Sequence, residues 1–312
     1  MRPGLPVLLL LLAACSADPA APDAGPGGGV TTVVAATTTT VLPTTTVTSV
    51  MTTTTTVPGP EPWAVVVVGD FGTGGAAEGE VAAAMASWVA QHPETRALVT
   101  TGDNFYISDV VAAWEQPFGW VAETGLPVWA VPGNHDLETP GQWLASEEAF
   151  GSYPRWRTQE VAGITFVLLD SNQVESEEQR AWLAKTATAL DGQPWIAVFH
   201  HPVKSCSLHG STEAVRRQWA DLLGSARLIL NGHDHNYQRF ETESGWQVVT
   251  GGGGQLLYDI KPCGDAAPDP VAGEVAWHFV VITGQGDTAE VTANDRFGGI
   301  IDSFVLDLAP RP

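Results

Sequence analysis

The sequence has 312 residues, of which 44% are hydrophobic and 12 are tryptophans, so it can bury a sizeable core and is not disordered overall. Its formal net charge is -21 at pH 7, because 35 acidic residues face only 14 lysines and arginines. This balance argues against a nucleic-acid groove and against a polybasic contact with lipid. Part of the negative charge could instead serve cation binding.

The amino-terminal residues predict export. "MRPGLPVLLLLLAACSA" has a basic residue, a short leucine run and small residues before Cys15, which is typical of a secretory signal peptide over residues 1–14. The leucine run is too short to cross a bilayer. Leu12-Ala13-Ala14-Cys15 also resembles the lipobox of bacterial lipoproteins. This resemblance implies that a diacylated Cys15 anchors an outward-facing protein, as its only contact with the membrane. An ordinary signal peptide with a chance cysteine is the alternative.

Residues 15–62 predict a linker between the lipid anchor and a folded domain. Residues 31–57 are dominated by threonine, with valine and proline between the threonines. Such a segment cannot close a core, so we interpret it as a stalk that would span roughly 40 Å as a flexible coil. A β-rich edge segment is the alternative, since threonine and valine favour strands, but the lack of alternation argues against it.

From Trp63 onward, apolar runs alternate with amphipathic stretches. The runs lie at 63–70, 97–103, 127–136, 163–172, 195–202, 226–235 and 246–254. The candidate helices lie near 76–91, 110–121, 140–150, 175–190 and 211–224. This alternation predicts a layered α/β domain with helices covering the sheet faces. Three later runs predict antiparallel strands that complete a second sheet, at 275–284, 288–295 and 299–308.

Nearly every predicted strand ends in residues that can bind metal or phosphate. In chain order these are Asp70, Asp103, Tyr106, Asn134, His135, Asp136, His200, His201, His233 and His235. Loops at one edge of an α/β sheet converge on a single crevice, so we expect these side chains to meet. Five of the eight histidines fall in the three motifs "GNHD", "FHHP" and "GHDH". Taken one at a time, each residue could instead be a turn, a helix cap or a buried histidine.

The donor types favour two metal ions. Two cations about 3.5–4 Å apart need a bridging ligand, and the Asp103 carboxylate can bridge. Hard oxygen donors such as Asp70 and Tyr106 suit a trivalent ion. Imidazole and amide donors suit a divalent first-row metal, and the chain offers His200, His233, His235 and Asn134.

The motifs "GDFG", "GDNFY", "GNHD", "HHP" and "GHDH" together resemble the five blocks of the calcineurin-like metallophosphoesterase superfamily. Many members carry Gly-Asp-x-His in the first block, where this chain has Gly72. Members that lack this histidine and carry a tyrosine three residues after the bridging aspartate are purple acid phosphatases. "GDNFY" is especially similar to the small, tartrate-resistant type. The resemblance covers residues 63 to about 254 and says less about 255–312.

The resemblance implies a fold, an activity and a set of metal ligands. The fold is a layered β-sandwich flanked by helices over residues 63–312. The activity is hydrolysis of small phosphate esters, with hydroxide formed at two cations attacking the phosphoryl group in line. The ferric ion would be held by Asp70, Asp103, Tyr106 and His235. The divalent Fe, Zn or Mn ion would be held by Asp103, Asn134, His200 and His233.

Two histidines are candidates for proton transfer. His135 follows a predicted ligand directly, so it should project into the crevice and could protonate a leaving group, with Asp136 orienting it. His209 in "CSLHGST" resembles the second active-site histidine of purple acid phosphatases, although it could also be an exposed loop residue. We expect His201 and Asp234 to support the ligands from behind.

With Cys15 carrying lipid, Cys206 and Cys263 remain. Two cysteines in an exported protein suggest one disulfide, although free thiols are equally possible. The "GGGG" run at 251–254 follows a strand and lacks the lysine of a nucleotide-binding loop, so it indicates close backbone packing near the site.

Three functions are compatible with these features. The leading hypothesis is phosphomonoester hydrolysis at the cell envelope. A phosphodiesterase or nucleotidase would use the same metals with a different pocket. A non-catalytic surface binding protein is the third possibility, and the complete set of ligands argues against it.

Overall fold

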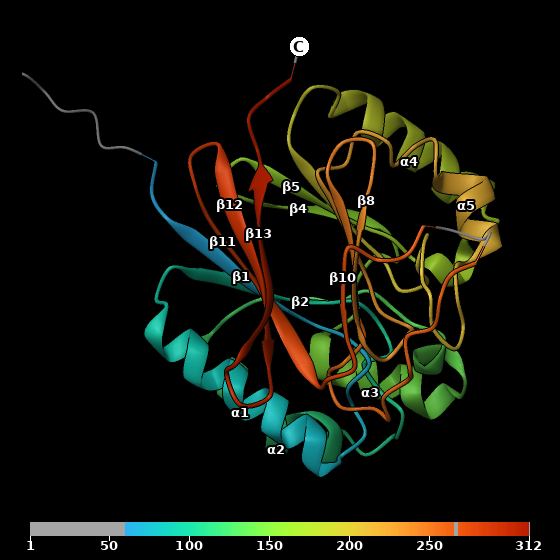
Figure 1. Cartoon of the computed structure of the whole chain (residues 1–312). Helices are drawn as coiled ribbons and strands as arrows, with labels where there is room; N and C mark the ends of the chain where they lie inside the picture. The colour runs from blue at the N-terminus through green and yellow to red at the C-terminus, as the bar shows by residue number, and fades with distance from the viewer. Residues whose placement is uncertain (1–59, 265–267, 312) are drawn as a thin grey trace, which may run out of the picture. The chain divides into compact units, whose positions relative to one another are not determined.

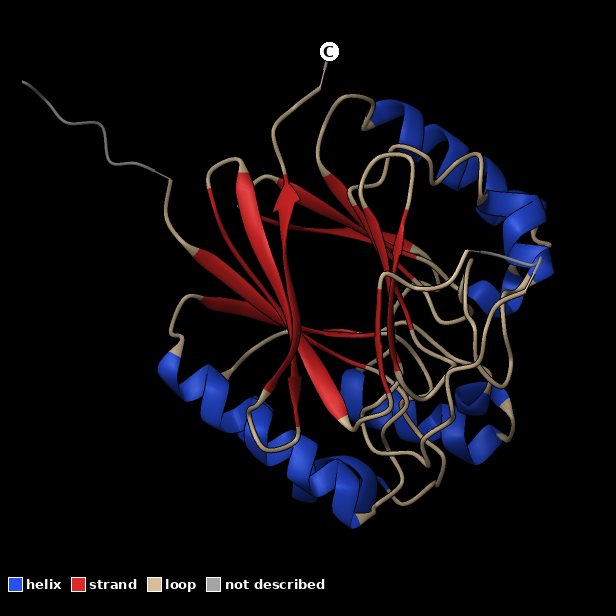
Figure 2. Ribbon diagram, viewed as in Figure 1, coloured by secondary structure: helices blue, strands red, loops and turns tan. Residues whose placement is uncertain are grey.

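The computed structural model describes residues 60–264 and 268–311, which form two packed β-sheets with helices outside them (Figure 1). Figure 2 shows the strands in the middle and the helices outside them on two sides. The predicted layered α/β architecture is therefore confirmed. The predicted signal peptide, Cys15 and the linker up to residue 59 lie outside the described residues. Among the residues that are described, no helix is both long enough and apolar enough to span a membrane.

The first sheet has six strands in the order β13-β12-β11-β1-β2-β3. They are β1 (Trp63–Val68), β2 (Thr95–Thr100), β3 (Val128–Trp129), β11 (His278–Gln285), β12 (Thr288–Asp295) and β13 (Ile300–Asp307). β1, β2 and β3 run parallel to one another. β11, β12 and β13 form an antiparallel meander that joins the sheet beside β1.

The second sheet has seven strands in the order β10-β8-β9-β7-β6-β5-β4. They are β4 (Arg157–Val161), β5 (Ile164–Leu168), β6 (Trp195–Val198), β7 (Leu228–Asn231), β8 (Tyr237–Glu241), β9 (Trp246–Thr250) and β10 (Ala272–Glu274). The central strands β5, β6, β7 and β9 are parallel, whereas β4, β8 and β10 pair antiparallel. The second sheet thus has a parallel centre, whereas the parallel strands of the first sheet lie at one end of its strand order. In both sheets, the loops that follow parallel strands leave at the same edge.

The helices cover the two outer faces. They are α1 (Ala76–Gln91), α2 (Gln116–Thr124), α3 (Pro140–Phe150), α4 (Glu177–Ala189) and α5 (Glu213–Trp219), with short turns η1 (Val111–Glu115), η2 (His135–Leu137) and η3 (Ser171–Gln173). Local chemistry sets their ends. The Thr139 hydroxyl caps α3 by accepting a hydrogen bond from the Gln142 amide, and Ser176 caps α4. Gly125 ends α2 in the left-handed conformation, with φ of 70°.

Alternate side chains of the central strands enter different cores, which explains their unbroken apolar sequences. Val65 and Val67 of β1 pack between the two sheets, whereas Val66 and Val68 pack against α1 and α2. On β6, Ile196 likewise faces the core between the sheets, and its neighbours face α4 and α5. Burial on both faces requires apolar residues at every position of these strands.

The structure corrects the predicted place of the last three strands. They are antiparallel as predicted, but they extend the first sheet, where β11 pairs with β1 and sets Val66 opposite Val281, and do not complete the second. Strands β4, β8 and β10 of the second sheet were not predicted. None of the three has an apolar run: β4 alternates between exposed and more buried positions, and β8 buries polar side chains such as Gln238. Helix α5 is also shorter than the predicted 211–224.

Candidate metal centre

The predicted ligands come from loops at the ends of five parallel strands. Asp70 follows β1, Asp103 follows β2, Asn134 follows β3, His200 follows β6 and His233 follows β7. The structure therefore brings residues 163 positions apart, such as Asp70 and His233, into hydrogen-bond contact.

Three of these residues have left-handed backbone conformations. The φ angles are 58° at Asp70, 49° at Asp103 and 73° at His233. Such angles are uncommon outside glycine and are maintained only where the surroundings hold them. Here the His233 amide donates to both carboxylate oxygens of Asp70 at 3.0 Å, and the His135 amide donates to Asp103 Oδ1 at 2.8 Å. Each strained residue is thus held by a neighbouring loop of the site.

The first group of donor atoms surrounds the Tyr106 hydroxyl. Its oxygen lies 3.1 Å from Asp103 Oδ2 and 3.4 Å from Asp70 Oδ1. His235 Nε2 lies 3.1 Å from the same hydroxyl and 3.4 Å from Asp70 Oδ1. This group contains all four residues predicted to hold the ferric ion.

The second group surrounds His200 Nε2. This nitrogen lies 3.1 Å from Asn134 Oδ1, 3.2 Å from His233 Nδ1 and 3.3 Å from Asp103 Oδ2. Asp103 thus belongs to both groups through the same oxygen. The structure brings all of the predicted ligands together in two groups, and their binding of metal stays a prediction.

The donor set fits a cation in each group. His200 Nδ1 lies 2.9 Å from the Thr101 carbonyl, and His235 Nδ1 lies 2.7 Å from the Leu256 carbonyl. A carbonyl only accepts, so in the neutral imidazole the proton is on Nδ1 and the lone pair of Nε2 faces the carboxylates. Burial opposes a positive charge on His200, but attraction to Asp103 outweighs it and raises the pKa of His200 to about 9. The site therefore attracts positive charge.

The position of Tyr106 depends on Gly72. The Tyr106 amide donates to the Gly72 carbonyl at 3.0 Å. Gly72 has φ of 57°, and a Cβ atom there would lie 1.8 Å from the Asn104 carbonyl oxygen. No histidine fits at this position, so the first loop cannot supply the imidazole that many superfamily members have there. The Tyr106 hydroxyl reaches the donor group instead.

His135 and His209 lie beside different predicted ligands. The His135 ring centroid is 4.5 Å from that of Tyr106, and the His209 ring centroid is 4.2 Å from that of His233. His135 is half-buried, whereas His209 is exposed to solvent. Both imidazoles can therefore approach a ligand bound at the site from outside.

The predicted role of Asp136 is wrong. Its carboxylate is fully buried and accepts hydrogen bonds from the Gly133 amide at 2.8 Å, the Phe105 amide at 3.0 Å and the Asn104 side chain at 2.8 Å. It therefore ties the loops after β2 and β3 together and does not orient His135. Burial, followed by repulsion from Asp103, raises the pKa of Asp136 to about 7. The partner of His135 is Glu138, whose Oε2 lies 2.6 Å from His135 Nδ1.

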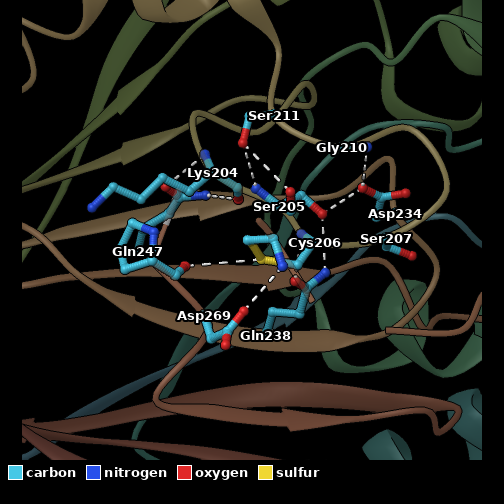
Figure 3. The surroundings of a disulfide bond; sticks show 12 residues. Lys204, Ser205, Cys206, Ser207, Gly210, Ser211, Asp234, Gln238, Gln247 and Asp269 are labelled. Atoms are coloured by element: carbon cyan, nitrogen blue, oxygen red, sulfur yellow. Dashed lines mark hydrogen bonds between the residues drawn. A yellow bond between two sulfur atoms is a disulfide. The ribbon is translucent and has the colours of Figure 1, made fainter. Parts of the chain in front are cut away.

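His201 and Asp234 support the site from behind, as their positions in the sequence suggested. His201 Nδ1 lies 2.7 Å from the Ser171 hydroxyl, and the His201 ring packs 4.5 Å from that of His233. Asp234 is fully buried and accepts from the amides of His209 and Gly210 at 2.9 and 3.2 Å. Figure 3 shows Asp234 beside Gly210 and Ser205, so this carboxylate fixes the loop that carries His209.

Cys206 and Cys263 are joined by a disulfide across 57 residues of sequence, which decides between the two alternatives that the sequence left open. The bond fastens the His209 loop to the segment after β9 (Figure 3). The Lys261 amide also donates to the Cys206 carbonyl at 2.7 Å. The two segments therefore lie side by side at the edge of the site.

The glycines at 251–254 pack against the site as predicted. A Cβ atom on Gly251 would lie 2.4 Å from the Asp234 carbonyl oxygen, and one on Gly253 would lie 2.3 Å from the Gly69 carbonyl oxygen. Only glycine allows the end of β9 to approach the loop after β1 this closely.

Sequence reasoning missed Glu138 and Tyr258. The Tyr258 ring stacks on His235 with centroids 4.1 Å apart and planes 18° apart. Glu138 is three residues after His135, a spacing that the turn of η2 converts into contact. That spacing could have indicated Glu138, whereas nothing in the "QLLYDI" sequence around Tyr258 indicates a metal site.

Residues 57–237, more than half of the chain, match the family model of the calcineurin-like phosphoesterases. The chain belongs to the calcineurin-like phosphoesterase family. The match ends two residues after His235, so this family member has every predicted ligand within the matched region.

Curated relatives include purple acid phosphatases. The chain is 25% identical over 231 residues to purple acid phosphatase 4 of Arabidopsis thaliana, covering 62% of this chain and 68% of the relative. It is 30% identical over 110 residues to tartrate-resistant acid phosphatase type 5 of Sus scrofa, covering 35% of this chain and 32% of the relative. The resemblance to purple acid phosphatases is therefore confirmed.

Two solved structures share the fold. A purple acid phosphatase from yellow lupin (Lupinus luteus) seeds superposes with a TM-score of 0.68 at 16% identity, over 80% of this chain and 54% of that chain. The anchor in the inner membrane complex of Plasmodium superposes with a TM-score of 0.67 at 16% identity, over 80% of this chain and 90% of that chain. At these identities the likeness establishes the fold alone.

Proposed function

We propose that this family member hydrolyses phosphomonoesters at a dinuclear centre of the purple acid phosphatase type. One observation carries the proposal: the two groups of donor atoms share Asp103, and a tyrosine hydroxyl completes the group that lacks a histidine from the first loop. Tyr106, Asp70 and His235 would hold Fe(III) with Asp103. Asn134, His200 and His233 would hold a divalent Fe, Zn or Mn ion with it.

When bound, the two cations neutralise charge on the phosphoryl group and lower the pKa of a water molecule. The chain supplies the groups that place and protonate the substrate. His135 Nδ1 is held by Glu138, which leaves Nε2 to face the crevice and donate a proton to the departing oxygen. His209, beside His233, is positioned to donate to a phosphate oxygen or to the same leaving group.

The Plasmodium neighbour is described as an anchor, so the fold by itself does not require catalysis. Our proposal rests on the donor set. A protein that served only to bind a partner through its surface would not need two aspartates in strained backbone conformations around a tyrosine hydroxyl.

The test compares a monoester with a diester. We expect the full chain, loaded with iron and zinc, to hydrolyse 4-nitrophenyl phosphate with a higher kcat/KM than bis(4-nitrophenyl) phosphate. A faster diester reaction would replace our proposal with a phosphodiesterase. A protein that contains two metals per chain and hydrolyses neither compound would support the non-catalytic alternative.

We further propose that the chain is exported and held at the outer face of the cell membrane by lipid on Cys15. The support is the Leu12-Ala13-Ala14-Cys15 sequence followed by a threonine-rich stalk. Cys15→Ser should move the protein from the membrane fraction to soluble or unprocessed fractions. An unchanged membrane fraction with normal processing would contradict the anchor.

A further inference from the structure

Two exposed leucines lie beside the donor groups. Leu256 is 71% exposed, and its carbonyl accepts the hydrogen bond from His235 Nδ1. Leu208 is 56% exposed and directly precedes His209. Because both leucines border the site, they offer apolar surface that a ligand bound there can cover.

Tyr258 adds an aromatic ring between the same two histidines. Its ring stacks on His235 at 4.1 Å and meets the His209 ring edge-on at 5.4 Å. The Tyr258 amide donates to the His235 carbonyl at 3.0 Å, which fixes the backbone beneath the ring. The ring therefore reaches from a predicted ligand to a candidate proton donor.

The segments that carry these side chains are held against each other. The Ser207 hydroxyl donates to the Asp259 carbonyl at 3.0 Å. The Asn236 side chain donates to the Ser207 hydroxyl at 2.8 Å and to the Tyr258 carbonyl at 3.0 Å. Together with the disulfide, these contacts keep Leu208 close to the segment of Leu256 and Tyr258. We call these three residues the apolar rim.

We propose that the apolar rim is a subsite for the leaving group of the substrate, and that the preferred substrates are monoesters of aromatic or similarly apolar alcohols. This inference rests on the proposed function, because a phosphate held by both donor groups would place its ester oxygen near His209 and the rim. The formal net charge of -21 disfavours a leaving group that carries further negative charge. A nucleoside polyphosphate therefore suits this site less well than an aryl phosphate.

The binding of phosphonates measures the contribution of the apolar rim to affinity without any hydrolysis. Phenylphosphonate and 2-naphthylphosphonate have the same head group and differ in apolar area, and neither has an ester bond to hydrolyse. We expect the full chain, loaded with iron and zinc, to bind the naphthyl compound about ten-fold more tightly in calorimetric titrations. Leu256→Ser and Leu208→Ser should each lower this preference several-fold.

Further variants test the role of the Tyr258 ring and provide a control at an exposed apolar residue elsewhere on the surface. Tyr258→Phe keeps the ring and should keep the preference, whereas Tyr258→Ala should abolish most of it. Val305→Ser removes a side chain of similar exposure, 67%, from β13 and should leave the preference unchanged. Tyr258 stacks on His235, so metal analysis of each variant is needed to show that both ions are still bound. Leu256→Ser changes the apolar rim and leaves this ring in place.

Equal affinity of the wild-type protein for the two phosphonates would overturn the inference, as would an unchanged preference in both Leu256→Ser and Tyr258→Ala. Failure of the proposed function has a different result: the metal-loaded chain would bind 2-naphthylphosphonate more tightly than phenylphosphonate but would not hydrolyse 2-naphthyl phosphate. In that case the subsite stands and the hydrolysis does not.

Discussion

The two sheets supply different chemistry to the candidate metal centre. Loops after the parallel strands of the first sheet supply oxygen donors, from Asp70, Asp103, Tyr106 and Asn134. Loops after β6 and β7 of the second sheet supply nitrogen donors, from His200, His233 and His235. Each group of donor atoms draws on both sheets, so neither sheet could complete a metal site alone. The core between the sheets therefore sets the distances between ligands.

Backbone contacts across the two sheets fit this conclusion. The Thr101 carbonyl, after a strand of the first sheet, fixes the His200 ring from the second sheet. A Cβ atom on Gly102 would lie 2.7 Å from His200 Nδ1, so glycine is needed where the two loops cross. A change at Asp103, which belongs to both groups, should affect both metals, whereas a change at a donor of one group should affect the metal of that group.

The largest effect should follow from Asp103→Ala, because Asp103 is the carboxylate common to both groups. We expect loss of both metals and a fall in kcat of more than about 100-fold, which exceeds the usual effect of groups that only orient a ligand. Metal analysis and steady-state kinetics measure the two outcomes. The exposed Asp259→Ala is the control. A variant that keeps two metals per chain would show that Asp103 does not bridge.

His135→Ala should lower kcat by about 100-fold if this imidazole protonates the leaving group. The loss should be larger with phenyl phosphate than with 4-nitrophenyl phosphate, because the more acidic nitrophenol leaves without help. Glu138→Gln should give a smaller loss with the same dependence on leaving group. Equal losses for the two substrates would assign His135 to phosphate binding.

Removing the disulfide should destabilise the rim more than the metal site. Closing a loop of 57 residues restricts the unfolded chain, so Cys206→Ser with Cys263→Ser should lower the free energy of unfolding by roughly 4 kcal/mol. Chemical denaturation measures this change. Mild reduction of the native protein should raise KM before any metal is released. Release of metal before KM changes would argue that the disulfide supports the ligands themselves.

A smaller effect on stability should come from protonation of His278, which lies at the start of β11 and forms a hydrogen bond to the second sheet. Its Nδ1 donates to the Ala276 carbonyl at 2.9 Å, and its Nε2 accepts from the Thr250 hydroxyl at the end of β9. Burial lowers the pKa of His278 from 6.5 to about 4, so the folded state favours the neutral ring. The stabilisation that comes from keeping this ring neutral is fully present above pH 6.5 and is lost as the pH falls toward 4. The free energy of unfolding falls by at most about 3 kcal/mol as a result.

Denaturation of the wild-type protein and of His278→Gln between pH 4 and 7 tests this linkage. The glutamine variant should show a shallower fall in stability over that range, since its side chain takes up no proton. Parallel curves for the two proteins would mean that other groups govern the acid sensitivity.

The candidate metal ligands could be predicted from the sequence because each follows an apolar strand, and parallel strands deliver such residues to one edge. The strand ends before Asp70 and His200 are examples. The partner of β11 could not be predicted, because an apolar strand pairs equally well with either sheet. Asp136 was misjudged for a related reason: its neighbours in space, Asn104 and Phe105, come from a different loop.

Tyr106 tests the central claim most directly, because it is where oxygen donors of the first sheet meet His235 of the second. Burial and the charges of Asp70 and Asp103 raise the pKa of the Tyr106 phenol well above its usual value, so a phenolate at neutral pH requires a bound cation. The decisive measurement is the visible spectrum of the oxidised, iron-loaded protein beside those of Tyr106→Phe and Asn134→Ala. We predict a pink or purple charge-transfer band in the wild-type protein, its loss in Tyr106→Phe and its retention in Asn134→Ala. A band and turnover that both persist in Tyr106→Phe would contradict the account and make Tyr106 a packing residue.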